Sequence, residues 1–169
     1  MFKKINNFED LVIWQLARLL VRDVYTQFKT CKDYDFNSQI HRAAVSIMNN
    51  IAEGFERSKF SKDNKQMLSF INISYGSCGE VRSMLYTAED LGYLDSKTAK
   101  SLRDRTTDLS FKMEAFIAKL KEHDTNTKLA TAKLTNSEAH QQRSSPTRSQ
   151  QHEVNHARIR YRLLYHPRC

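Results

Sequence analysis

One stretch of the chain, QIHRAAVSIMNNIAEGFER at residues 39–57, repeats apolar residues at spacings of four, three and four. Side chains spaced in this way stack on one face of an α-helix, and we expect that face to be buried. The face consists of Ile40, Ala44, Ile47 and Ile51. Gly54 follows within one turn, and glycine commonly supplies the left-handed residue just past a helix end. The pattern predicts a helix that follows a turn at residues 31–35 and ends at Gly54.

Three more segments have the helical period, and no strand pattern competes within residues 1–122. We expect helices over residues 8–30, from a link at residues 56–62 to Gly92, and from a cap at Asp95 or the next residue, Ser96. The predicted core positions are Met67, Ile71, Ser74, Cys78, Val81, Leu85 and Ala88 in the third helix, and Ala99, Leu102, Thr106, Leu109, Met113, Phe116 and Leu120 in the fourth. The links between the predicted helices are too short to cross a bundle, so we expect helices that follow one another in the sequence to pack side by side and antiparallel. The fold class is therefore all-α, an up-and-down antiparallel four-helix bundle.

The third helix is expected to begin at a serine cap, Ser58 or Ser61. Its middle is unusually small, because Ser74, Gly76, Ser77, Cys78 and Gly79 cluster there. A glycine inside a helix costs roughly 1 kcal/mol relative to alanine. We therefore expect another element to approach this segment closely.

The first helix is apolar over more of its circumference than one bundle covers. Its polar residues occupy a wedge of roughly 140° at about 100° per residue. These are Gln15, Arg18, Arg22 and Asp23. A helix with so wide an apolar arc is usually sandwiched, so we expect part of it at a subunit interface of a homo-oligomer. The candidate interface residues are Ile13, Leu16 and Leu20.

A polar stripe runs beside the core face of the second helix. It consists of Ser46, Asn50, Glu53 and Arg57, with Ser77 and Glu80 of the third helix as expected partners. One hypothesis makes Glu53 and Glu80 a carboxylate pair for acid and base catalysis. We favour a structural polar motif, comprising Ser46, Asn50, Glu53, Ser77 and Glu80, whose hydrogen bonds set the register between the helices. For His41 on the same helix, a satisfied structural role is favoured over a general base.

From residue 123 onward the helical period stops. Residues 123–157 lack Phe, Tyr and Trp and cannot bury enough apolar surface to offset the entropy of ordering. We expect residues 123–169 to be a disordered, basic tail. Its end alternates Arg158, Arg160 and Arg162 with Ile159, Tyr161 and Leu163, which suits contacts to bases and phosphates. A solvated terminus is the favoured interpretation.

The charge of the chain suits an anionic partner. There are 27 Lys and Arg against 19 Asp and Glu, a net charge of +8, with a pI of about 9.5. Residues 1–122 hold 19 of the basic and 16 of the acidic side chains, so the tail is the more basic part. Basic surfaces neutralise phosphates and release counterions, which makes RNA or DNA a candidate partner.

Other classes of protein find little support in the sequence. No apolar run approaches the ~18 residues of a membrane span, and the amino terminus lacks the features of a secretory signal, so we expect a cytoplasmic protein without membrane contact. The three cysteines are far apart and are expected to be reduced. His152 and His156 would share a helical face, but they lie in the tail. We expect no metal, no cofactor and no catalytic residue.

Three blocks of the sequence resemble a known family. QIHRAAVSIMNNIAEG, preceded by FEDLVIWQLA and followed by SYGSCGEVRSMLYTAEDLGYL, is similar to the 23S ribosomal-RNA intervening-sequence proteins. Relatives of that family include the accessory variability proteins of diversity-generating retroelements. The resemblance spans roughly residues 5–122. It implies a four-helix subunit assembled as a barrel-shaped homopentamer and, for the retroelement members, binding of a reverse transcriptase and its template RNA through a basic surface.

Two functions follow as hypotheses. The first is a non-enzymatic, oligomeric scaffold that binds nucleic acid, as the resemblance implies, serving either a retroelement or an rRNA intervening sequence. Its candidate phosphate contacts are Arg18, Arg22, Arg57, Lys59, Lys62 and Lys65. The alternative is a protein-interaction module that binds a partner helix through the surplus apolar face of the first helix, without nucleic acid.

Overall fold

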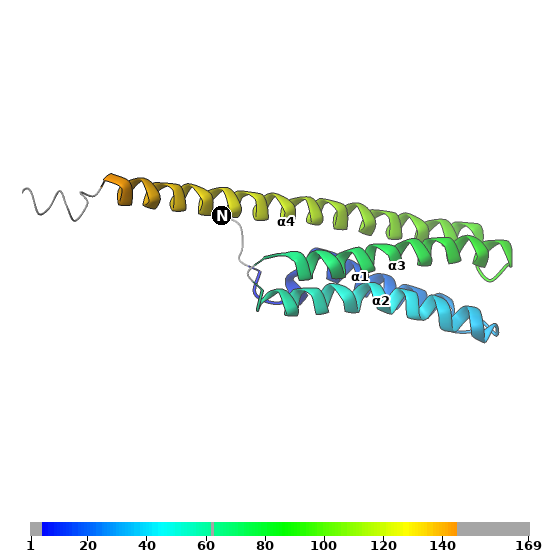
Figure 1. The fold of residues 1–169 in the computed structure, drawn as a ribbon. Helices are drawn as coiled ribbons and strands as arrows, with labels where there is room; N and C mark the ends of the chain where they lie inside the picture. The colour runs from blue at the N-terminus through cyan, green and yellow to red at the C-terminus, as the bar shows by residue number, and fades with distance from the viewer. Residues whose placement is uncertain (1–4, 62, 145–169) are drawn as a thin grey trace, which may run out of the picture. The chain divides into compact units, whose positions relative to one another are not determined.

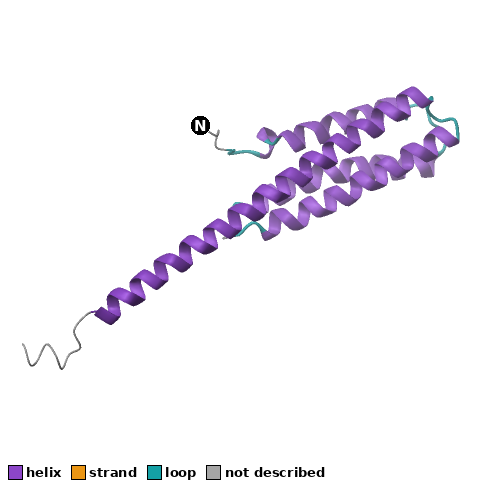
Figure 2. Cartoon of the chain, turned by 90° about the horizontal axis from the view of Figure 1, so that it is seen from above, coloured by secondary structure: helices purple, strands orange, loops and turns teal. Residues whose placement is uncertain are grey.

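Helices account for all the regular structure in the part of the chain that is described. The computed structural model describes residues 5–61 and 63–144, except for the side chains of residues 134 and 136–144 (Figure 1). A short 3-10 turn, η1 (Phe8–Asp10), precedes α1 (Val12–Gln27), α2 (Tyr34–Ser58), α3 (Lys65–Asp90) and α4 (Ser96–Ser144). Figure 2 shows helices and loops without a strand in these residues. The all-α prediction with four helices is confirmed.

Successive helices run antiparallel within the compact unit formed by Met1–Asp124. In the contacts between neighbouring helices, residue numbers increase along one helix while they decrease along the other. Between α1 and α2 the contacts join Tyr25 to His41, and Phe28, which directly follows α1, to Phe36. On α2 and α3 they join Gln39 to Glu80 and Ser46 to Ser77. On α3 and α4 they join Glu89 to Arg103 and Tyr75 to Glu114.

The predicted heptads fill the core. Ile40, Ala44, Ile47 and Ile51 of α2 are completely buried, and all seven predicted positions of α3 are buried. On α4 the first five predicted positions are buried, while Phe116 and Leu120 are partly exposed. On α4 the buried hydroxyls of Thr106 and Ser110 donate to carbonyls of α4 itself. On α3 the hydroxyl of Ser74 lies 3.1 Å both from the carbonyl of Phe70 in its own helix and from the carbonyl of Ile47 on α2.

Gly54 does not end α2, and the sequence-based prediction of a helix stop there is wrong. The helix continues to Ser58, and Gly54 is a buried residue on its core side. A Cβ at this position would lie 2.7 Å from the Cβ of Phe70 on α3. The glycine is required because α2 and α3 approach closely here; its backbone does not adopt the left-handed conformation.

The ends of α3 differ from each other in how well they were predicted. Gly92 has φ +71 and terminates the helix as expected. The N-cap position belongs to Asn64, not to Ser58 or Ser61, and the carboxylate of Asp63 accepts from the backbone N–H of Lys65 at 3.1 Å. Gly76 and Gly79 have no atom of the described residues within 4 Å of a Cβ position, so the expected close approach is absent there.

The fourth helix begins as predicted and extends beyond its expected end. Asp95 caps α4, its carboxylate accepting from the backbone N–H of Thr98 at 2.9 Å. The prediction of disorder from residue 123 is wrong up to Ser144, because α4 continues to that residue. No Gly or Pro occurs between Gly92 and Pro146, and extending a formed helix requires no new nucleation. Residues 145–169, including the predicted arginine-rich end and the pair His152 and His156, lie outside the described residues.

The chain divides at Asp124 into two units, with Thr125–Cys169 as the second. The described side chains of residues 125–133 are all exposed, as expected for a segment so poor in large apolar residues. A helix that spans a membrane needs a longer apolar run than any helix in the described parts of the chain contains.

Candidate functional site

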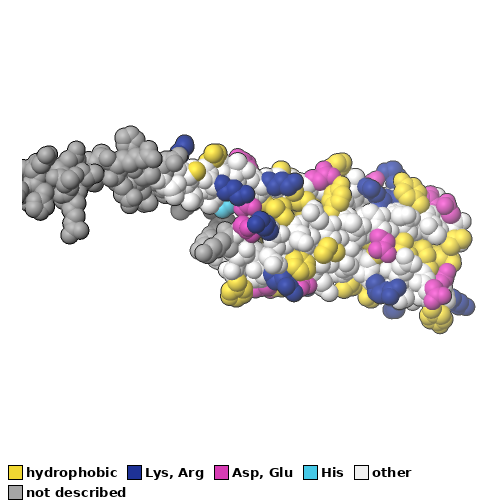
Figure 3. All heavy atoms as spheres, in the orientation of Figure 1, with side chains coloured by type: hydrophobic (Ala, Val, Ile, Leu, Met, Phe, Trp, Pro, Cys, Tyr) yellow, Lys and Arg dark blue, Asp and Glu magenta, His cyan; other side chains and the backbone are white. Residues whose placement is uncertain are grey.

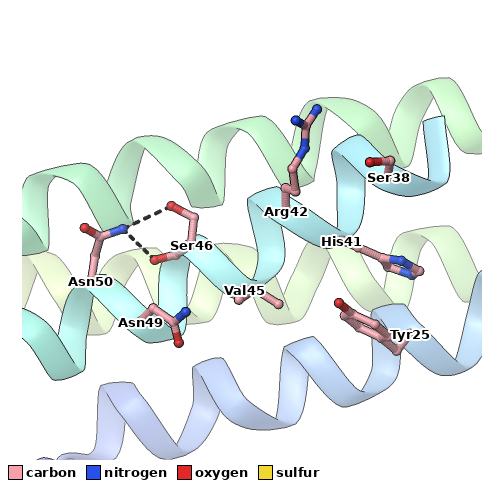
Figure 4. Close-up of a pocket in the computed structure, with 8 residues that line it drawn as sticks. All are labelled: Tyr25, Ser38, His41, Arg42, Val45, Ser46, Asn49 and Asn50. Carbon is pink, nitrogen blue, oxygen red and sulfur yellow. Dashed lines mark hydrogen bonds between the residues drawn. The ribbon is translucent and has the colours of Figure 1, made fainter. Parts of the chain in front are cut away.

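A chain of hydrogen bonds joins α2 to α3 at the predicted polar motif. The side-chain amide of Asn50 donates to the hydroxyl of Ser46 at 3.1 Å, and that hydroxyl lies 2.9 Å from the hydroxyl of Ser77. Ser77 in turn donates to the carbonyl of Ile73 at 3.1 Å. Since each hydroxyl has one proton, Ser46 donates to Ser77. Figure 4 shows the Asn50 and Ser46 end of this network.

The two glutamates of the motif lie elsewhere. Glu53 forms an ion pair with Arg57 at 2.7 Å on the surface of α2. Glu80 accepts from the amide of Gln39 at 3.3 Å. The positions of Gln39 and Glu53 on α2 are separated by about 20 Å at 1.5 Å per residue. The hypothesis of a carboxylate pair therefore fails on geometry, and the hydrogen-bonded motif consists of Ser46, Asn50 and Ser77.

A groove lined mainly by polar residues runs along the outer side of α2 beside this network. It has a volume of about 580 Å³ and is lined by Tyr25 of α1 and by Ser38, His41, Arg42, Val45, Ser46, Asn49 and Asn50 of α2 (Figure 4). None of the lining residues is acidic. Arg42 is exposed, and it forms no ion pair or hydrogen bond with the described residues. The groove therefore presents one unneutralised guanidinium among hydroxyl and amide groups.

Tyr25 and His41 form one wall of the groove. Their rings stack with centroids 3.9 Å apart and an interplanar angle of 9°. Burial lowers the pKa of His41, so its imidazole is neutral at pH 7. Its Nε2 atom is buried without a hydrogen-bond partner among the described residues. The histidine has the expected packing role, but the prediction that its hydrogen bonds are satisfied is wrong.

Most of the predicted phosphate contacts are neutralised by neighbouring carboxylates. Arg22 pairs with Asp23, Arg57 with Glu53, Lys59 with Glu56 and Lys65 with Asp63, at 2.7 to 3.3 Å. Arg18 lies over the ring of Trp14 at 5.8 Å from its centroid, and Lys62 lies outside the described residues. On the face shown in Figure 3, basic and acidic side chains are interspersed. The predicted residues do not gather into one basic site.

Two of the three predicted interface residues belong to the core of the subunit. Ile13 and Leu20 are 4% and 3% exposed, because α1 turns this stripe toward the other helices. The apolar side chains that remain exposed on α1 include Val12 at 59% and Leu19 at 43%. Leu16 and Leu19 line a second groove of about 490 Å³, together with Asp104, Arg105 and Asp108 of α4.

The described residues offer no metal centre, and the buried thiol of Cys78 is not activated. No group of three or more His, Cys, Asp or Glu lies together within the described parts of the chain. Burial raises the pKa of Cys78 to about 12, so the thiol is protonated at neutral pH. Cys31 is also free, and Cys169 lies outside the described residues.

Sequence reasoning missed Arg42, Ser38 and Asn49. A signal for them was present, because these residues follow at spacings of four and seven and so share one face of the helix. That face lies opposite the buried isoleucines. No acidic residue lies between Asp35 and Glu53 of this helix, which was visible in the sequence as well.

Comparison with known proteins supports the resemblance noted from the sequence. The model of the 23S rRNA-intervening sequence protein family matches residues 9–115, which is more than half of the chain. One similar solved structure is a protein of unknown function from the S23 ribosomal protein family of Bacteroides thetaiotaomicron, with 17% identity and a TM-score of 0.57. The match covers 63% of this chain and 98% of that protein, and at this identity it bears on the fold alone. No curated protein matches. The four antiparallel helices and the family match together show that the chain belongs to the 23S rRNA-intervening sequence protein family.

Proposed function

We propose that this protein is a non-enzymatic, oligomeric scaffold that binds RNA in the cytoplasm. The observation that carries the proposal is the surplus of positive charge, a net +8 on 169 residues. Positive surface charge gives affinity for nucleic acid through the release of condensed counterions. Membership of a family named for an rRNA intervening sequence supports RNA as the anion.

The exposed apolar residues of α1 support assembly. Val12 and Leu19 lie on the surface of a single subunit, and exposed apolar surface of this kind commonly forms contacts between copies. By resemblance to relatives we propose a homopentamer. Repeated basic surfaces on one assembly bind a long polyanion more tightly than a single surface does. A role beside the reverse transcriptase of a diversity-generating retroelement, or with an rRNA intervening sequence, is part of the same proposal.

Salt-dependent retention of RNA tests this function. The full-length protein should retain a structured RNA hairpin and a single strand at ~50 mM salt and release both steeply by ~200 mM. Light scattering in the same buffer should give a stable oligomer. If RNA and DNA are not retained even at low salt, the proposal is overturned.

A protein-interaction module is the second candidate. The groove between α1 and α4 favours it, since Leu16 and Leu19 line an apolar strip between charged residues of both helices. This arrangement suits the apolar face of a partner helix. Retention of a reverse transcriptase by the purified protein in the absence of RNA, with no retention of RNA alone, would favour this second function.

A further inference from the structure

We infer that the groove on the outer side of α2, centred on Arg42, binds the phosphodiester backbone of RNA. The inference rests on the proposed RNA-binding function and names the surface that carries it. Arg42 is the charged residue of the groove, and no carboxylate lines it. Glu80 of α3 is held by Gln39 and makes no ion pair with Arg42 within the described residues.

Arg42 differs in this respect from four of the six arginines and lysines predicted as phosphate contacts. Arg22, Arg57, Lys59 and Lys65 each lie within 3.3 Å of a carboxylate, so a phosphate would have to displace an internal partner. Arg42 has no such partner. A guanidinium without a counterion can form charge-assisted, bidentate hydrogen bonds with a phosphate at no loss of an existing pair.

Two further groups extend the site along the helix. Ser38 and Asn49 are exposed, and neither forms a hydrogen bond with the described residues, whereas the amide of Asn50 is occupied by Ser46. Ser38 and Asn49 are separated by about 16 Å along the helix axis at 1.5 Å per residue. Groups so far apart cannot converge on one phosphate. They match a row of phosphates, whose spacing along one strand of a duplex is about 3.4 Å.

The aromatic wall suits the bases of such a strand. Tyr25 is 46% exposed, and its stacked partner His41 is uncharged at pH 7. Surfaces that bind single-stranded nucleic acid combine a cationic track with exposed aromatic rings, because every base offers a face for stacking. In Figure 4 the guanidinium of Arg42 points away from Tyr25 and His41. The backbone and the bases of one strand can therefore occupy opposite sides of the groove.

Two pairs of variants with matched charge test the inference in the full chain. Arg42→Gln and Arg82→Gln each remove one exposed arginine, but Arg82 lies on α3 outside the groove. Asn49→Asp and Asn72→Asp each add one carboxylate, and Asn72 also lies on α3. Binding of a labelled single-stranded RNA is measured against salt concentration for all four, with circular dichroism as the check on folding.

We expect Arg42→Gln and Asn49→Asp to weaken binding by roughly tenfold. The slope of log K against log salt should fall by about one for Arg42→Gln. Arg82→Gln and Asn72→Asp should change the affinity less than about twofold. If the two variants of each pair change the RNA affinity equally while the wild type binds RNA, the groove is not the binding site, but the proposed RNA-binding function is retained. If the wild type binds no RNA, both the inference and the proposed function fail.

Competition with inorganic phosphate at constant ionic strength distinguishes a site for an RNA strand from a site for a small anion. Phosphate should displace the RNA no better than sulfate does. If inorganic phosphate alone displaces the RNA at micromolar concentration, and does so only when Arg42 is present, the groove is a small-anion site and the inference is overturned.

Discussion

Gly54 on α2 lies directly against Phe70 on α3, where an added Cβ would come within 2.7 Å of the phenylalanine Cβ. Two helix backbones therefore approach more closely here than any residue with a side chain allows. We expect Gly54→Ala to lower the free energy of unfolding by about 1–3 kcal/mol, because overpacking outweighs the better helix propensity of alanine. Urea unfolding checks this.

The matched control for that substitution is Gly76→Ala. Gly76 lies within α3, and a Cβ there would meet no atom within 4 Å among the described residues. We expect this variant to be more stable than the wild type by about 0.5–1 kcal/mol. Equal destabilisation by the two variants would contradict the close approach at Gly54.

Leu20 and Leu19, neighbours on α1, should respond in opposite ways to mutation. Leu20 is 3% exposed, so Leu20→Ala should cost about 2–5 kcal/mol of subunit stability. Leu19 is 43% exposed, so Leu19→Glu should leave helicity intact and, if α1 forms the proposed subunit contact, lower the mass measured by light scattering. Loss of helicity in Leu19→Glu would contradict this assignment of the two faces.

The hydroxyls of Ser46 and Ser77 should be energetically coupled. Their oxygens lie 2.9 Å apart between α2 and α3. Removing either partner should cost about 1 kcal/mol, and removing both should cost less than the sum, because no buried group is then left unpaired. A double-mutant cycle with Ser46→Ala and Ser77→Ala measures this coupling. Additive costs would show that the contact does not stabilise the fold.

Stability should depend on pH through His41. Its pKa is lowered by burial from 6.5, so the unfolded chain binds a proton more readily than the folded protein does. The stabilising contribution is therefore complete above pH 6.5 and is lost as the pH falls through 6.5 toward the lower pKa of the folded state. Melting temperatures between about pH 5 and 8 should show this slope, and His41→Gln should flatten it. An unchanged slope in the variant would assign the effect to other groups.

The sequence was sufficient to predict the four helices and the buried faces of α2 and α3, because apolar residues at heptad spacing define one face of a helix. Gly54 was misread, since glycine serves both at helix ends and at close contacts, and only Phe70 across the interface distinguishes the two. Ile13 and Leu20 were placed on the outer face because α1 has two apolar stripes, and the neighbours decide which one is buried.

The candidate site was predicted less well than the fold. The pairs of Glu53 with Arg57 and Glu56 with Lys59 follow the ordinary helical spacing, so their mutual neutralisation could have been anticipated. The absence of an ionic partner for Arg42 could not be anticipated, because it depends on which side chains α1 and α3 bring beside this residue.

The buried hydroxyls differ between the helices in a way that bears on local unfolding. Those of Ser74 and Ser77 reach α2, so α2 and α3 cannot separate without losing hydrogen bonds between them. The hydroxyl of Thr106 is satisfied inside α4, and that of Ser110 bonds within α4 and also to the thiol of Cys78 on α3. Fewer buried hydroxyl bonds therefore join α4 to α3 than join α3 to α2. Amide protons of α2 and α3 should accordingly exchange with solvent in a single cooperative step of high free energy, and those of α4 in an earlier opening.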